Sequence, residues 1–303
     1  MRFKRLDLNL LVALDHMLTL RSVSEAATRM HMSQSAMSNA LTRLRTYFDD
    51  PLLVQVGRKM ILTPRAEGMR GPVRDILVRV DATIDTDPVF RPEATDRQFS
   101  ILLSDYTMQV LIPHVLAVAD EAGSRVHFRF LPQTDQPYVM LERGEADLLI
   151  APQQFCSSAH PSDALFEDRY VCVAWKDGAH GNGPLTAEAF VEAGHVVMVP
   201  PTAARSVETI LLARLGITRR EEVTSFSFSS LPELVVGTDR IATVHESIAR
   251  KALARMPLVQ RDLPFVVDGL SQHMQWHEIR AHDPGIQWLR EIFHLGVERM
   301  NGH

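Results

Sequence analysis

The chain has 303 residues, 46% hydrophobic and 23% charged, which exceeds one ordinary domain and excludes a disordered or fibrous protein. Its two cysteines, Cys156 and Cys172, exclude a disulfide framework and lack the spacing of a metal site. The N-terminal segment has no signal-peptide pattern, and no apolar run approaches the roughly 18 residues that span a membrane, so we expect a cytoplasmic protein.

Charge is distributed unevenly along the chain. Residues 1–65 hold ten Lys and Arg against five Asp and Glu, whereas residues 66–303 hold 22 against 32. A basic head on an acidic body indicates that only the head meets a polyanion such as nucleic acid.

The first 50 residues predict three short helices. Residues 7–20 carry leucines at helical spacing, with Asp7 as the N-cap. Ser22 stands three residues before Glu25, which is the spacing of a capping box at the start of a second helix. After a turn at residues 31–32, Ser33 caps a third helix that reaches residue 48. This order is typical of a helix-turn-helix.

The third predicted helix has one apolar face and one polar face. The polar face holds the residues that we expect to contact DNA: Gln34, Ser35, Ser38, Asn39, Thr42 and Arg43. Gln and Asn can pair with adenine and Arg with guanine in the major groove, whereas the alternative is a solvated polar face. Residues 52–63 then predict a β-hairpin, whose tip residues Arg58 and Lys59 would contact phosphates.

Residues 63–88 predict a helix that begins at Thr63 and Pro64. Its apolar residues recur at nearly coiled-coil spacing: Met69, Val73, Leu77, Val80 and Ile84. We expect this seam to pair two chains, and the alternative is a helix packed on its own chain. Pro72 lies inside the pattern and should kink or break the helix.

Residues 91–303 predict an α/β body. Strands are expected at 99–103, 126–131, 146–151, 170–175, 195–200, 225–228, 240–245 and 264–267. Helices are expected after the first strand and near 135–143, 186–193, 206–215, 231–237, 246–255 and 285–300. The first three strands alternate with helices, which indicates a parallel sheet.

Ligands of parallel α/β sheets bind beyond the carboxyl ends of the strands. This rule selects candidate effector-binding residues: Ser104, Asp105, Tyr106, Thr107, Pro201, Thr202, Phe226 and His245. A carboxylate or phenolate would suit these helix ends, although Asp105 would repel an anion. The alternative is that the hydroxyls only cap helices.

The segments AATRMHMSQSAMS (26–38) and LTRLRTYFDDPLL (41–53) resemble the N-terminal domain of the LysR-type transcriptional regulators. The family pattern often has a basic residue where this chain has Asn39, which leaves the preferred bases open. The segments GPVR (71–74) and WHEIRAHDPGIQWLR (276–290) are similar to the branch containing the nodulation regulator NodD and the salicylate-responsive NahR. That branch implies an aromatic effector.

The resemblance implies a winged helix-turn-helix over residues 1–62, a dimerising linker helix over 63–88 and an effector domain over 91–303. The effector domain would have two lobes like those of periplasmic binding proteins. Lobe I would take about 91–161 and 268–303, lobe II about 162–267, and the chain would cross near 152–165 and 263–269.

The function implied is a ligand-responsive, sequence-specific regulator that assembles as a dimer and tetramer on a pseudo-palindromic DNA site and contacts RNA polymerase. No catalytic motif is present, and no metal or cofactor is expected besides an unidentified small-molecule effector. The alternatives are a ligand-insensitive regulator and a thiol-redox regulator using Cys156 or Cys172.

Overall fold

The computed structural model describes residues 6–57, 59–84, 89–200 and 205–302. The chain forms two compact units, Met1–Thr86 and Asp87–His303, which are described separately below. Within the described residues, no helix has the length and apolar character needed to cross a membrane.

The first unit contains helices α1 (Leu8–Leu20), α2 (Val23–Arg29) and α3 (Gln34–Phe48). Each begins at its predicted N-cap, Asp7, Ser22 or Ser33, whose side chain accepts the backbone N–H three residues later. Ala26 and Ala27 of α2 are buried, and their small side chains allow α2 to pack closely against the neighbouring helices. The predicted helix-turn-helix is confirmed.

A two-stranded antiparallel hairpin follows α3, with strands β1 (Leu53–Val56) and β2 (Lys59–Leu62). Gly57 in the turn has a φ of 63°, which glycine adopts without strain. Arg45 of α3 donates hydrogen bonds of 2.8 Å to the carbonyl oxygens of Pro51 and Leu53. The guanidinium therefore ties the hairpin to the helix.

Helix α4 (Pro64–Ile84) continues through Pro72, so the helix does not break there, and the expected kink stays a prediction. Met69, Val73 and Leu77 pack against the core of α1–α3. The expected pairing seam is therefore wrong for Val73, which is buried within its own chain, whereas Met69 and Leu77 are only partly buried there. The large apolar residues that the described part of α4 exposes are Ile76 and Ile84, of which Ile84 belongs to the expected seam.

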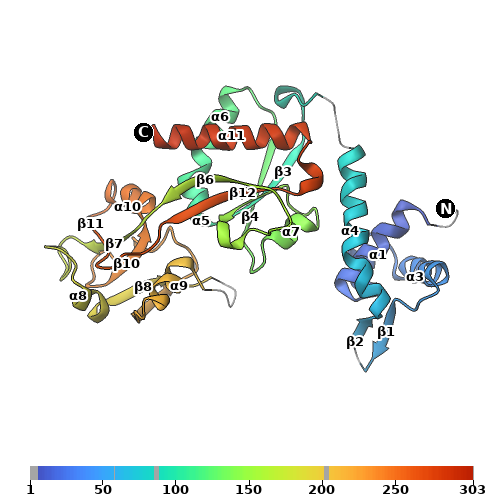
Figure 1. Cartoon of the computed structure of the whole chain (residues 1–303), viewed down its shortest axis with the longest axis horizontal. Coiled ribbons are helices and arrows are strands. Elements are labelled where there is room, and N and C mark those ends of the chain that lie inside the picture. Colours follow the sequence, from blue (N-terminus) through green and yellow to red (C-terminus); the bar gives the residue numbers. More distant parts are fainter. Residues whose placement is uncertain (1–5, 58, 85–88, 201–204, 303) are drawn as a thin grey trace. The chain divides into compact units, whose positions relative to one another are not determined.

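The second unit contains two five-stranded sheets, shown in Figure 1. The first has the order β4-β3-β5-β12-β6 and the second the order β11-β7-β10-β8-β9. The first sheet consists of β3 (Gln98–Leu103), β4 (His127–Pro132), β5 (Leu148–Pro152), β6 (Ser162–Asp168) and β12 (Leu270–Gln275). The second consists of β7 (Tyr170–Trp175), β8 (Gly194–Met198), β9 (Arg220–Ser225), β10 (Ile241–His245) and β11 (Leu258–Arg261).

Parallel pairing joins β3 to β4 and β5 in the first sheet, and β8 to β9 and β10 in the second. Strands β6, β7, β11 and β12 pair antiparallel to their neighbours. The predicted α/β class with two lobes is confirmed.

Helices cover the sheets and occupy their connections. Those of the first lobe are α5 (Asp105–Val110), α6 (Ile112–Glu121), α7 (Tyr138–Glu142) and α11 (Pro284–Asn301), with short 3-10 turns at Pro92–Ala94, Gln153–Phe155 and Glu278–Arg280. Those of the second are α8 (Ala187–Glu192), α9 (Val207–Arg214) and α10 (Glu246–Leu253). Helix α11 lies along α6 (Figure 1). A Cβ on Gly296 would lie 2.7 Å from Val115 Cγ2, so glycine permits this close crossing.

The crossing between the lobes differs from the expectation. Strand β6 pairs with β12 in the first sheet, although the expected boundary assigned it to lobe II. The chain therefore crosses at Arg169, between β6 and β7, and returns between β11 and β12. The expected return over 263–269 falls within that second segment.

Three further expectations are wrong. The apolar run at 264–267 forms no strand, because it lies in the returning segment, where Val266 is 94% exposed. The strand expected at 225–228 lies earlier, at β9, whose polar residues edge the sheet and hide the usual apolar pattern. The helix expected at 231–237 is a series of turns.

Candidate DNA interface and effector cavity

The exposed face of α3 holds all six predicted base-contacting residues: Gln34, Ser35, Ser38, Asn39, Thr42 and Arg43. Met37 and Leu44 on the opposite face are fully buried. The Arg43 guanidinium lies 3.3 Å from the Asp7 carboxylate, with both side chains more than half exposed. Such an exposed pair is weak, so Arg43 can exchange this carboxylate for DNA at little cost.

The hairpin beside α3 presents Lys59 in solvent. Arg58, its expected partner in phosphate binding, lies outside the described residues. The compact unit thus combines a helix with an exposed polar face and a basic hairpin. In this type of arrangement the helix contacts base edges in the major groove of DNA and the hairpin contacts the adjacent phosphate backbone.

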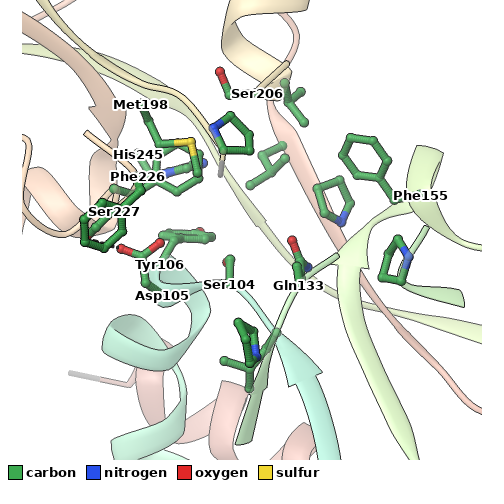
Figure 2. Close-up of a pocket in the computed structure, with 18 of the residues that line it drawn as sticks. Ser104, Asp105, Tyr106, Gln133, Phe155, Met198, Ser206, Phe226, Ser227 and His245 are labelled. Carbon is green, nitrogen blue, oxygen red and sulfur yellow. Dashed lines mark hydrogen bonds between the residues drawn. The ribbon is translucent and has the colours of Figure 1, made fainter. Parts of the chain in front are cut away.

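A cavity of about 430 Å³ lies between the two sheets of the second unit (Figure 2). The carboxyl ends of the parallel strands of both sheets contribute to its wall. Ser104, Asp105 and Tyr106 follow β3, Gln133 follows β4, and His245 ends β10. The edge that parallel-sheet topology selects for ligands is therefore the edge at which this cavity opens.

Aromatic rings line one side of the cavity. Tyr106 and His245 stack with their centroids 3.8 Å apart and their planes at 19°. Tyr170 and Phe228 flank the same imidazole with centroids 5.0 and 4.9 Å away. Burial lowers the pKa of His245 to about 3, so this imidazole is neutral at physiological pH.

The Tyr106 hydroxyl donates a 2.7 Å hydrogen bond to Asp168 at the end of β6. Burial, together with the Asp168 carboxylate, raises the pKa of Tyr106 above its usual range. The phenol is therefore neutral, and its ring is fixed by the hydroxyl at one end and by His245 on its face.

Asp105 links the two lobes across the cavity. Its Oδ2 accepts a 2.7 Å hydrogen bond from the Ser227 hydroxyl and a 2.9 Å hydrogen bond from the Ser229 backbone N–H. Figure 2 shows the Asp105 carboxylate turned toward Ser227. A second link runs from Lys251 Nζ to the Gln109 carbonyl at 2.6 Å.

Five predicted effector-binding residues line the cavity: Ser104, Asp105, Tyr106, Phe226 and His245. Thr107 is fully buried and does not line the cavity. Its backbone N–H donates a hydrogen bond to the hydroxyl of Ser104, which caps the helix. Pro201 and Thr202 lie outside the described residues.

The sequence interpretation missed further wall residues: Gln133, Phe155, Tyr170, Met198, Ser206 and Gln272. Gln133 follows the predicted strand 126–131 closely, so the strand-end rule could have found it, whereas Met198 lay inside the predicted strand 195–200 and ends β8 only in the structure. Tyr170 and Gln272 come from antiparallel strands that the pattern does not connect to this edge.

Both cysteines are free thiols, Cys156 half-buried and Cys172 buried. Burial raises the pKa of Cys156 to about 11 and that of the fully buried Cys172 to about 12. The reactive thiolate is therefore disfavoured at both positions. Among the described residues, no group of three or more His, Cys, Asp or Glu side chains could hold a metal ion.

Comparison with known families decides the assignment. Residues 8–67 match the bacterial regulatory helix-turn-helix protein, lysR family, and residues 93–296 match the LysR substrate binding domain. The chain belongs to the LysR family. Nodulation protein D 2 of Bradyrhizobium diazoefficiens is 40% identical over 301 residues, which cover 99% of this chain and 91% of that protein.

Solved structures of LysR-type regulators have the same architecture. A probable transcriptional regulator from Pseudomonas aeruginosa is 27% identical with a TM-score of 0.64, covering 96% of this chain and 97% of that one. Full-length OxyR from the same organism has a TM-score of 0.68 at 15% identity, covering 97% of this chain and 95% of that one. The latter likeness concerns the fold alone.

The protein is thus a LysR-type, ligand-responsive transcriptional regulator that binds DNA, similar to nodulation protein D. The family assignment favours a regulator over an enzyme and does not favour the redox or ligand-insensitive alternatives.

Proposed function

We propose that this LysR-type regulator senses a small aromatic metabolite bound in the cavity of its second unit. The observation that carries this proposal is the Tyr106–His245 stack, with Tyr170 and Phe228 beside it. Planar rings pack favourably in offset or edge-on arrangements, so a planar ligand gains the same contacts. The volume of about 430 Å³ falls in the range of roughly 300–1,000 Å³ that is typical of small-molecule sites.

The effector contacts in this proposal come from both lobes. They include the predicted Ser104, Asp105, Tyr106, Phe226 and His245, and also Gln133, Phe155, Met198 and Gln272. Thr107 supports them by holding the Ser104 cap.

A thermal-shift screen of the full-length protein with aromatic metabolites tests the effector class, because a ligand of the native state raises the melting temperature by mass action. Phe226→Ala is the informative variant, since Phe226 lines the cavity but is 76% exposed and contributes little to the core. The affinity of the Phe226→Ala protein for an aromatic ligand found in the screen should fall several-fold. Val266→Ala, at a residue exposed away from the cavity wall, should bind as the wild type does.

The proposal fails if no aromatic compound stabilises the protein. It also fails if Phe226→Ala binds an identified aromatic ligand as tightly as the wild type.

On DNA, the proposed base contacts are the exposed residues of α3: Gln34, Ser35, Ser38, Asn39, Thr42 and Arg43. The proposed phosphate contacts are Arg58 and Lys59 of the hairpin. Positive charge supports affinity, whereas the amide and hydroxyl groups support sequence discrimination.

We further propose that two chains pair through α4 and that two such dimers assemble on a pseudo-palindromic site in the cytoplasm, beside RNA polymerase. Ile76 is 45% exposed and Ile84 is 71% exposed, two turns apart on α4, which supports burial against a second copy. The effector acts only if it binds one arrangement of the assembly more tightly than another.

A further inference from the structure

The Asp105 carboxylate occupies hydrogen-bond donors that an acidic effector would use. Its Oδ2 accepts both the Ser227 hydroxyl, at 2.7 Å, and the Ser229 backbone N–H, at 2.9 Å. A hydroxyl paired with a backbone N–H is the type of donor set that binds a carboxylate group. In this protein the carboxylate is the Asp105 side chain, which reaches the Ser227 and Ser229 donors from the opposite lobe.

The other charges on the cavity wall also disfavour an acid. Asp105 and Asp135 supply two carboxylates, and the cation among the described wall residues is Arg205. Asp135 and Arg205 are both exposed, whereas Asp105 is half-buried. His245 supplies no positive charge, since burial keeps its imidazole neutral. Solvent screens the exposed charges of Asp135 and Arg205, so an anionic ligand in this space would be repelled mainly by the Asp105 carboxylate.

The wall nevertheless offers polar groups to a neutral ligand. Gln272 is 2% exposed, and its Oε1 accepts no hydrogen bond from any described residue. A buried acceptor without a partner favours a ligand that carries a hydroxyl or amide N–H. Ser104, Gln133 and Ser206 add polar atoms around the same space.

We infer that Asp105 is a specificity determinant that excludes carboxylate effectors, so that the effector is a neutral aromatic compound with hydrogen-bond donors. This inference rests on the proposed binding of an aromatic ligand in the cavity. It assigns Asp105 two linked roles, because the carboxylate that joins the lobes is also the charge that repels an acid.

The test compares aromatic acids with their amides, which keep the shape and remove the charge. Isothermal titration calorimetry would use full-length protein with benzoate and benzamide, cinnamate and cinnamamide, and 2-naphthoate and 2-naphthamide. We expect the wild type to bind the better amides about tenfold or more tightly than the matching acids, since like charges at a binding site oppose association.

Asp105→Ala removes the internal anion and frees the Ser227 and Ser229 donors, so the acids should gain about tenfold in affinity. Asp105→Asn replaces the alanine variant in the test if that variant does not fold. It removes only the charge and retains an acceptor for the Ser229 N–H, so it should reduce the discrimination between acids and amides. Asp135→Asn is the matched control, because it removes a carboxylate from the same wall without freeing these donors. Its acid-to-amide ratio should stay within about threefold of the wild type.

The inference is overturned if wild-type protein binds acids as tightly as amides, or if Asp135→Asn admits acids as readily as Asp105→Ala. If neither acids nor amides bind any of the proteins, the proposed aromatic class itself fails and the selectivity falls with it. Acid binding to the wild type, by contrast, overturns the selectivity and leaves the aromatic class intact.

Discussion

The Arg74 guanidinium lies 2.5 Å from the Asp15 carboxylate, and both groups are withdrawn from solvent, with side-chain exposures of 17% and 5%. The pair joins α4 to α1 beside the packed side chain of Val73. The linker helix is therefore part of the DNA-binding unit rather than a flexible tether to it.

Loss of either partner should destabilise this unit, because the ion pair would be lost while the remaining charge stayed withdrawn from solvent. Asp15→Asn or Arg74→Met should lower the free energy of unfolding by about 3 kcal/mol, as measured by urea denaturation of the full-length protein. Arg21→Gln is the control, because its pair with Glu67 is half exposed at 3.7 Å. An Asp15→Asn protein as stable as the wild type would contradict the assignment.

Stability should fall in mild acid because two buried histidines resist protonation. Burial lowers the pKa of His245 to about 3 and that of His195 to about 4, whereas an unfolded histidine has a pKa of about 6.5. Their neutral forms therefore stabilise the fold above about pH 6.5, and this contribution decreases as pH falls toward the folded pKa values. Each histidine can contribute up to about 1.4 kcal/mol per pH unit in that window.

Urea unfolding at pH 7.5, 6 and 5 checks this dependence. His245→Gln should give a shallower decrease than the wild type, whereas His282→Gln, at an exposed position, should leave the slope unchanged. Equal slopes for all three proteins would rule out the contribution of His245.

Base recognition and backbone contact should separate by mutation. Asn39→Ala should reduce discrimination between operator variants by roughly 1–3 kcal/mol for each lost base contact. Lys59→Ala should weaken binding to all sequences alike and flatten the dependence on salt. Fluorescence anisotropy with matched operator duplexes at several salt concentrations distinguishes the two, and unchanged sequence preference in Asn39→Ala would place the base-reading face elsewhere on α3.

Assembly should depend on the exposed face of α4. Ile76→Glu combined with Ile84→Glu should raise the dimer dissociation constant about tenfold or more, because two apolar groups would no longer be buried. Sedimentation velocity across a concentration series measures the change. Asp75→Lys, an exposed charge change on the same helix, should have a smaller effect, and wild-type-like assembly of the double variant would exclude this face.

The thiols should be inert in the native protein. Burial raises the pKa of Cys156 and Cys172, so a thiol reagent at pH 7.5 should label them slowly until the chain is unfolded. Operator affinity should also survive hydrogen peroxide. A peroxide response that is lost in Cys156→Ser would contradict this expectation.

The DNA-binding unit was largely predictable because its signals are local. Asp7, Ser22 and Ser33 each cap the helix that immediately follows, so a few neighbouring residues determine each boundary. The packing of α4 was not predictable in this way. Met69 and Val73 satisfy a coiled-coil seam and an intrachain core equally well, and only the fold shows that they pack against the core of α1–α3.

The cavity was predictable where a residue directly follows an apolar parallel strand, as Ser104 and Asp105 follow β3. It was not predictable where the wall depends on distant pairing. Gln272 lies in the polar strand β12, which reaches the cavity only by pairing with β5 and β6. The contact between Asp105 and Ser227 likewise spans 122 residues, and no local pattern encodes it.

The two hydrogen bonds from Arg45 to the start of the hairpin have a consequence for the choice of operator. Because they hold helix and hairpin at a fixed separation, the protein has little freedom to follow variation in groove width, and the duplex must supply the adjustment. Operators should therefore be ranked partly by how easily the steps between the helix and hairpin contacts bend or twist, including at base pairs that no side chain touches.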